Sequence, residues 1–353
     1  MRRCVSQAVA YYPILADQGI CYGQNGVATV RLMLPKTAQQ VSIKLMDGPE
    51  FALNKDESGA WTGSFAPGMG FAYADVVIDG EVVLSPYLPI GFGASRPINY
   101  IDVPGEGDEF YQPCEAASGT VVQHYFASSL TGETETCLVY RPAHYDANRA
   151  YPVLYLQHGL GENEAGWVHQ GRMNHILDRL IESGEAQEML VVMCSGMVQM
   201  NGEFDYAIFP QLLVQDVIPF IERTYRVKTD KWNRAMAGLS MGSMHTSMAT
   251  MTHPELFGYA GLFSGFLRYI WHEEQPHLAA LDDPKKFAED YRVFFRAMGE
   301  EDQFFKWFAE DDQILKEKGV QVTRRLYPGG HGWQVWRHCL RDFLPLIFKE
   351  KSV

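Results

Sequence analysis

A serine flanked by two glycines is the clearest candidate nucleophile in this chain of 353 residues. The pentapeptide Gly238-Leu-Ser-Met-Gly242 follows a predicted strand, Arg234–Ala237, and opens a predicted helix, Met241–Thr250. A strand–turn–helix junction of this kind is the setting of a nucleophile elbow, where glycines let the backbone turn sharply and leave the serine hydroxyl exposed. The pattern therefore predicts Ser240 as a nucleophile, against the alternative of an ordinary Gly/Ser turn.

A serine nucleophile needs a base, and in this architecture the base follows the serine in the chain, after an acid. His331 lies in Tyr327-Pro-Gly-Gly-His-Gly-Trp333, a glycine-rich loop between a predicted strand, Val320–Tyr327, and the last predicted helix. A loop at the carboxyl end of a strand lets an imidazole reach back over the sheet, so His331 is the predicted base. The other nearby histidines lie on or beside helices and are predicted to face elsewhere: His245, His253 and His338.

The acid that orients this base is expected in the turn after the preceding predicted strand, Val293–Ala297. Asp302 is the predicted acid because the turn lets it project toward the His331 loop and because its short side chain holds an imidazole rigidly. Glu301 is the alternative, and a set of solvated turn acids is the other interpretation.

Two backbone amides must hold the negative charge that develops when a serine attacks a carbonyl group. Met241 begins the helix that follows the nucleophile, so its amide is one predicted donor. The turn after the first core strand, His158-Gly-Leu-Gly161, supplies the other, predicted to be the Leu160 amide. His158 itself is predicted to form hydrogen bonds within its loop.

The elements that must position these residues belong to an α/β domain. Continuous apolar runs such as Tyr151–Gln157, Met189–Cys194 and Tyr259–Phe263 indicate strands buried on both faces. Helical patterns separate them, so the sequence predicts a mostly parallel sheet with crossover helices. Functional residues of such a sheet lie at the carboxyl ends of its strands.

The first hundred residues have a different pattern of predicted elements. Short strands such as Val41–Leu45 and Trp61–Phe65 follow each other without helices, and Asp79-Gly80 is a hairpin-turn dipeptide. This spacing favours a small β-sandwich. The predicted organisation is therefore a β-sandwich at 1–104, a Gly/Pro/acid linker at 105–118 and the α/β domain at 119–353.

The amino-acid composition of the chain excludes some classes of binding partner. The chain has 30 basic and 43 acidic side chains, a net charge of −13, so neither nucleic acid nor a membrane surface is expected to bind it. No metalloprotease, P-loop or dinucleotide motif is present, so no metal or other cofactor is expected. Six scattered cysteines and a first segment without a continuous apolar run predict a cytoplasmic protein without a signal peptide. The oligomeric state is left open, a homo-oligomer included.

Several motifs together resemble a known family over roughly the second two thirds of the chain. They are His158-Gly-Leu-Gly-Glu-Asn-Glu-Ala-Gly-Trp167, Gln170-Gly-Arg-Met-Asn174, Gly238-Leu-Ser-Met-Gly242 and Gly330-His-Gly-Trp-Gln-Val-Trp336. They look like carbohydrate esterase family one, the putative-esterase family that includes feruloyl and acetyl xylan esterases and is related to esterase D. The resemblance implies an α/β-hydrolase fold, a catalytic triad of Ser240, Asp302 and His331, and oxyanion donors at Leu160 and Met241.

The first domain is similar to the immunoglobulin-like modules of the glycogen-binding type that precede many such esterases. Lys55-Asp-Glu-Ser-Gly-Ala-Trp61 and Val77-Ile-Asp-Gly80 carry the likeness. Leu84-Ser-Pro86 stands where an Asp-Pro pair is usual, so a scaffold role is weighed equally with carbohydrate binding.

The sequence thus predicts a serine carboxylesterase that acts on small-molecule or oligosaccharide esters of plant origin. Trp167 and Trp333 lie next to the oxyanion loop and the predicted base, where their rings would stack on an aryl acid such as ferulate, unless both are packing residues. An acetyl esterase on xylan-type oligosaccharides is the alternative. Acyl transfer to a sugar and a carbohydrate-binding protein with a vestigial hydrolase domain are the remaining hypotheses.

Overall fold

The computed structural model describes residues 2–3, 18–23, 26–113, 118–269 and 273–349. Residues 114–117 of the predicted linker lie outside the described residues. The chain divides into two compact units, residues 1–109 and residues 110–353, which are described separately here.

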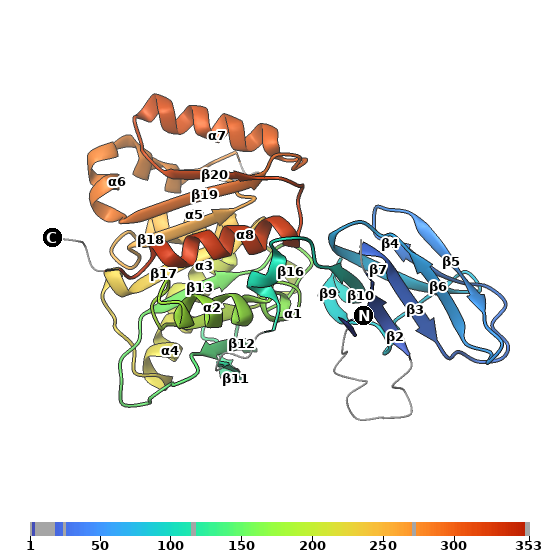
Figure 1. Cartoon of the computed structure of the whole chain (residues 1–353). Coiled ribbons are helices and arrows are strands. Elements are labelled where there is room, and N and C mark those ends of the chain that lie inside the picture. Colours follow the sequence, from blue (N-terminus) through green and yellow to red (C-terminus); the bar gives the residue numbers. More distant parts are fainter. Residues whose placement is uncertain (1, 4–17, 24–25, 114–117, 270–272, 350–353) are drawn as a thin grey trace. The chain divides into compact units, whose positions relative to one another are not determined.

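The first unit is built from antiparallel strands in the spatial order β1-β2-β3-β6-β5-β4-β7-β10-β9, with β8 paired to β7 (Figure 1). Their bounds are β1 Arg2–Arg3, β2 Gly19–Tyr22, β3 Ala28–Leu32, β4 Val41–Leu45, β5 Glu50–Lys55, β6 Trp61–Phe65, β7 Gly70–Ile78, β8 Glu81–Val83, β9 Ile90–Gly93 and β10 Arg96–Val103. A 3-10 turn, η3 (Asp108–Tyr111), follows.

The alternation of residue types in these strands produces one apolar core. Along β4, Val41, Ile43 and Leu45 are buried and the residues between them are not. They share a single cluster with buried side chains of β3, β6 and β7. The predicted Asp79-Gly80 turn is confirmed, since both residues have positive φ values and join β7 to β8 as a tight hairpin.

The second unit contains an eight-stranded sheet in the order β11-β12-β14-β13-β17-β18-β19-β20. The strands are β11 Thr120–Ala127, β12 Thr134–Arg141, β13 Val153–Gln157, β14 Leu190–Cys194, β17 Arg234–Leu239, β18 Tyr259–Phe263, β19 Val293–Gly299 and β20 Thr323–Tyr327. The pairs from β14 through β20 are parallel, whereas β11 and β12 are antiparallel additions at one edge. The mostly parallel sheet predicted from the apolar runs is thus present.

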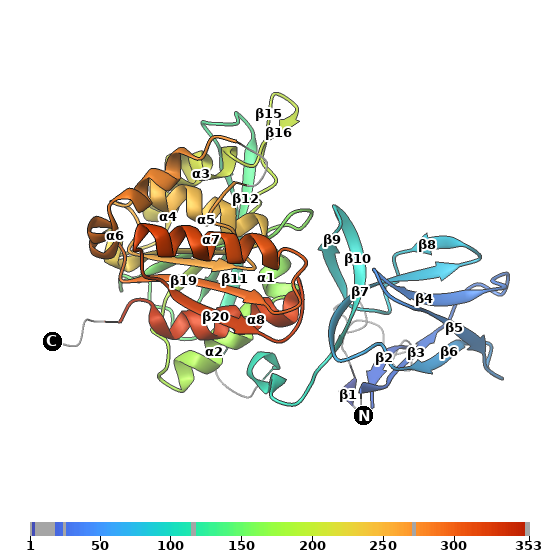
Figure 2. The same ribbon diagram turned by 90° about the horizontal axis from the view of Figure 1, so that it is seen from above.

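Helices cover both faces of this sheet, as parallel strands require. Figure 2 shows α2 and α8 on one side of the sheet and α3, α4 and α5 on the other. The helical segments are α1 Gly166–His169, α2 Met173–Glu182, α3 Ile208–Leu212, the π-helical turn η4 Leu213–Val217, α4 Ile218–Thr224, η5 Lys231–Asn233, α5 Met241–Thr252, η6 Pro276–Asp282, α6 Pro284–Asp290, α7 Phe305–Lys318, α8 Trp333–Phe343 and η7 Leu344–Leu346. A small hairpin of β15 (Gln199–Met200) and β16 (Glu203–Phe204) stands apart from the sheet. No helix among the described residues is long and apolar enough to cross a membrane.

Candidate active site

Ser240 lies at a strained turn between the end of β17 and the start of α5. Its backbone has φ 51° and ψ −115°, a conformation that a non-glycine residue rarely adopts without a functional reason. A Cβ atom on Gly238 would collide with the carbonyl of Gly242, and one on Gly242 would lie 2.6 Å from the carbonyl oxygens of Gln157 and His158. The two glycines are therefore required, because they let α5 approach β13 closely enough to hold the serine above the sheet.

The imidazole of His331 bridges the serine and an acid. Its Nδ1 lies 2.8 Å from Asp302 Oδ2, and its Nε2 lies 2.9 Å from Ser240 Oγ. Because an ionised carboxylate can only accept, Nδ1 carries the proton and Nε2 is left to accept the proton of the serine hydroxyl. This arrangement can activate the hydroxyl for attack on a carbonyl carbon.

The turn after β19 contains three consecutive acids, of which the structure brings only Asp302 to the imidazole. The side chain of Asp302 is fully buried, and its Oδ1 accepts the Phe304 amide at 2.9 Å. Glu300 and Glu301 are exposed on the same turn. Burial alone would raise the pKa of the Asp302 carboxyl, but the hydrogen bond and charge of His331, the Phe304 amide and the Ser264 hydroxyl hold that pKa below its ordinary value.

The two predicted oxyanion donors occupy positions that suit the role. Met241 is the first residue of α5, where an amide has no acceptor within the helix. In the loop after β13 the Gly159 amide donates to Glu162 Oε2 at 3.1 Å, so it is already engaged. The next amide along is that of Leu160, a residue that is 48% exposed.

The structure corrects the prediction that Trp167 and Trp333 stack on a substrate. Both side chains are only 1% exposed, and their rings pack edge to face with centroids 5.2 Å apart. The Trp167 indole also donates to the Gln157 carbonyl at 3.0 Å. Neither ring has a face available to a ligand, so both are packing residues.

Aromatic residues that the sequence analysis missed stand next to the imidazole instead. The ring of Phe304 meets that of His331 edge-on at 4.8 Å and stacks on Trp307 at 5.5 Å. Both Phe304 and Trp307 are half-buried and pack against the buried ring of Phe266. Their position two and five residues after Asp302, at the start of a helix, was the available signal.

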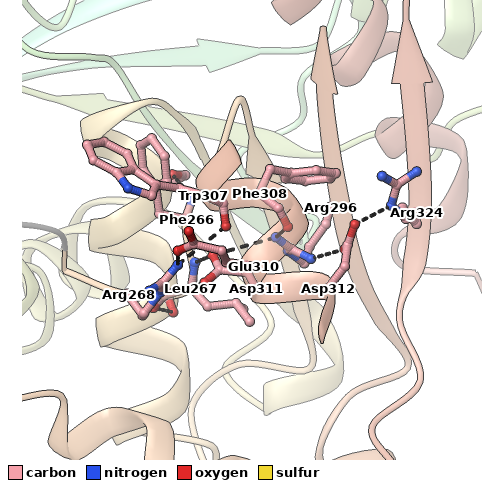
Figure 3. Close-up of polar contacts among 12 residues, drawn as sticks. Phe266, Leu267, Arg268, Arg296, Trp307, Phe308, Glu310, Asp311, Asp312 and Arg324 are labelled. Atoms are coloured by element: carbon pink, nitrogen blue, oxygen red, sulfur yellow. Dashed lines mark hydrogen bonds and ion pairs between the residues drawn. The ribbon is translucent and has the colours of Figure 1, made fainter. Parts of the chain in front are cut away.

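Figure 3 shows the ion-pair network around α7, the helix that carries Trp307. Asp311 of α7 is fully buried; its Oδ2 accepts the Leu267 amide at 2.8 Å and its Oδ1 accepts Arg268 Nε at 2.7 Å. The fully buried Arg296 of β19 lies 3.6 Å from the same carboxylate and also pairs with Asp312. Buried charges of opposite sign compensate each other here, so α7 is tied both to β19 and to the segment after β18.

Two buried histidines behind the elbow are structural. His158 Nδ1 contacts the Gly159 carbonyl at 2.8 Å, which is the predicted contact within its loop, and its Nε2 accepts the Gly196 amide of the segment after β14 at 2.8 Å. His245 is fully buried on α5 against Phe209. Burial lowers the pKa of His158 to about 4, and burial together with the charge of His158 lowers the pKa of His245 to about 3.

These two imidazoles predict an acid-sensitive fold. Between pH 6.5 and about 4 the unfolded chain protonates both histidines while the folded protein keeps them neutral, so the free energy of unfolding falls as the pH falls. Each group contributes up to about 1.4 kcal/mol per pH unit. His245→Phe should reduce the dependence of the free energy of unfolding on pH by up to about 1.4 kcal/mol per pH unit. The measurement is urea unfolding between pH 4.5 and 7, followed by intrinsic fluorescence. An unchanged slope would contradict the assignment of His245 as a buried neutral group.

Among the described residues no cluster of three or more His, Cys, Asp or Glu side chains is placed to hold a metal ion.

An α/β-hydrolase-type sheet that carries a serine, a histidine and an aspartate at the carboxyl ends of its strands defines the class of the second unit. Residues 128–347 match the family model described as "Putative esterase", so the chain belongs to this esterase family.

Three individual relatives show how far the likeness extends. The chain is 34% identical over 340 residues to an endo-1,4-beta-xylanase/feruloyl esterase of Xylanibacter ruminicola, which covers 92% of this chain and 45% of that protein. A feruloyl esterase module from Clostridium thermocellum, solved with sinapinate, is 26% identical with a TM-score of 0.59 and covers 70% of this chain and 93% of its own. The enterobactin esterase of Shigella flexneri, at 14% identity, shares the fold alone, with a TM-score of 0.63 over 94% of this chain and 96% of its own. The chain spans less than half the length of the curated xylanases it matches.

Proposed function

We propose that the protein is a serine carboxylic ester hydrolase that releases hydroxycinnamic acids from plant carbohydrate esters. The observation that carries the proposal is the pair of contacts that links Ser240 Oγ to His331 Nε2 and His331 Nδ1 to Asp302. The feruloyl esterase function of the xylanase relative and the sinapinate bound in the solved feruloyl esterase module support the acyl group.

In this proposal the reaction proceeds through four proton transfers at one nitrogen, His331 Nε2. Ser240 Oγ attacks the ester carbonyl carbon while His331 Nε2 takes the hydroxyl proton, and the Leu160 and Met241 amides hold the resulting oxyanion. The tetrahedral intermediate collapses as His331 returns the proton to the departing alcohol oxygen, which leaves an acyl-enzyme. Water, deprotonated by His331, then attacks the acyl carbon; the acid leaves and Ser240 regains its proton.

The acyl group would lie against the half-buried aromatic wall of Phe304 and Trp307. The ring centroids of Phe304 and His331 lie 4.8 Å apart, so the wall stands beside the imidazole that contacts Ser240. It belongs to a larger apolar cluster whose other half-buried members include Met197, Phe204 and Tyr206. An aryl ring gains from such contacts, whereas an acetyl group is too small to reach them.

Initial rates on methyl ferulate and on an acetylated xylooligosaccharide test the acyl preference. We expect faster release of ferulate, and we expect Trp307→Ala to lower kcat/KM on methyl ferulate by about tenfold while changing acetate release little. Trp232→Ala is the matched control, since Trp232 is a half-buried indole on η5, between cationic side chains and outside this cluster. Acetate release alone, or an equal effect of Trp307→Ala on both substrates, would favour the acetyl esterase instead.

We also propose that the first unit is an immunoglobulin-like module. Its all-antiparallel strands with one shared apolar core support this assignment. The fold of the enterobactin esterase neighbour is matched over 94% of this chain, so the likeness extends into the first unit.

A further inference from the structure

The carboxylate of Asp302 has more hydrogen-bonding capacity than its two clear partners use. A carboxylate offers about four lone-pair sites, and His331 and the Phe304 amide each occupy one. The side chain is fully buried, so water cannot easily supply the remainder. During the proposed reaction this carboxylate must stay ionised and in place while His331 becomes positively charged, so a further donor would stabilise it when the demand is greatest.

Ser264 is located where such a donor would have to be. It directly follows β18, and its amide donates to the Ala297 carbonyl of β19 at 2.8 Å. Two residues beyond Ala297, the Gly299 carbonyl accepts the amide of Asp302 at 3.2 Å. The ends of two neighbouring parallel strands therefore bring Ser264 and Asp302 together.

The backbone of Ser264 is strained, and its side chain is fully buried. Its φ is 44°, in the left-handed region where glycine would cost less by roughly 1 kcal/mol. The next residue is a glycine, Gly265, yet the position with the positive φ is occupied by serine. A serine in this conformation is best explained by what its side chain does.

The hydroxyl of Ser264 is a buried donor close to an acid, because its residue and Asp302 follow neighbouring parallel strands. Among the described residues no acceptor meets the distance and angle of a hydrogen bond to it. Its electrostatic partner is the carboxylate of Asp302, whose pKa it helps to lower. Catalytic hydrogen bonds are often long in the resting enzyme and tighten only during the reaction.

We propose that Ser264 is a positioning residue, which donates its hydroxyl to the Asp302 carboxylate as His331 takes the proton of Ser240. The inference rests on the proposed function, because it assigns a role within the same relay. Ser264 touches neither the substrate nor the reacting atoms, so its loss should lower kcat and leave KM unchanged. A hydrogen bond to a charged group of ordinary strength corresponds to about a tenfold decrease in kcat.

The test compares Ser264→Ala and Ser264→Gly with Ser247→Ala, on a 4-nitrophenyl ester, with thermal unfolding as a check on folding. Ser247 is an equally buried serine on α5, but it donates to the Leu267 carbonyl at 2.7 Å and is outside the relay. Both Ser264 variants should lose about tenfold in kcat, glycine included although it relieves the strain, while Ser247→Ala keeps wild-type kcat. Wild-type kcat in Ser264→Gly would assign the alanine effect to backbone strain and overturn the proposal.

A double-mutant cycle separates a positioning role from a merely structural one. In an Asp302→Asn background the carboxylate is absent, so Ser264→Ala should cause no further loss of kcat. If the two losses multiply, the hydroxyl does not act through Asp302 and the inference fails. Wild-type kcat in Ser264→Ala together with an inactive Ser240→Ala would overturn only this inference, whereas an active Ser240→Ala would overturn the proposed function itself.

Discussion

Replacing Ser240 with alanine should lower kcat on methyl ferulate by about 10⁵- to 10⁶-fold, with little change in thermal stability. The variant keeps the oxyanion amides and the acyl-binding wall, so the residual rate should still exceed that in water. It lacks the hydroxyl oxygen that lies 2.9 Å from His331 Nε2. The strain at this residue lies in its backbone dihedral angles, which alanine would share, so removing the hydroxyl should change stability little.

Labelling with a fluorophosphonate probe provides an independent measurement, because only an activated serine reacts with it. The wild-type protein and the Ser247→Ala control should each be labelled once, at Ser240, and Ser240→Ala should not be labelled. Retention of activity within tenfold in Ser240→Ala would refute the nucleophile assignment. A wild-type protein that neither labels nor turns over any ester would favour a carbohydrate-binding protein with a vestigial hydrolase domain.

Asp302→Asn should lower kcat by about ten-thousandfold while the protein stays folded. The amide can still accept from the backbone of Phe304 through its oxygen, and it then presents its NH₂ group to His331 Nδ1. A donor at that position forces the proton onto Nε2, the nitrogen that must accept from Ser240. The variant thus retains every heavy atom of the site and holds the imidazole in the wrong tautomer.

Glu301→Gln is the matched control for this change. Glu301 is the adjacent acid on the same turn and is exposed, so its replacement should leave kcat within about twofold of the wild-type value. If Glu301→Gln were the more damaging of the two, the orienting acid would be Glu301 and the placement of Asp302 beside the imidazole would not represent the working enzyme. Equal, small effects of both substitutions would mean that His331 needs no orienting carboxylate.

The nucleophile could be predicted from local sequence because everything that creates it is local. A strand, a turn that excludes side chains at Gly238 and Gly242, and a helix follow one another within twenty residues. The order of the strands in the sheet then places the loops after β19 and β20 beside this turn, so the chain order of serine, acid and base was enough to single out His331.

Residues whose role depends on direction or burial could not be settled in the same way. Glu301 and Asp302 are neighbours of similar chemistry, and only the path of the turn decides which of them is buried against the imidazole. Trp167 and Trp333 are next to the predicted site loops in sequence, yet both side chains are buried in the fold. A short distance along the chain predicts that a residue lies near the site, but it cannot predict whether its side chain is buried or exposed to a ligand.

The sequence by itself determined the class of sheet, the elbow with Ser240 and the histidine that serves it, because backbone geometry and strand order follow from short-range patterns. Only the tertiary structure chose the predicted acid Asp302 over Glu301, and only it revealed the aromatic wall of Phe304 and Trp307 and the approach of Ser264 to Asp302. Each of these depends on contacts between buried side chains of separate strands and helices. Such contacts are set by packing among elements that are distant in the chain, and no local pattern encodes them.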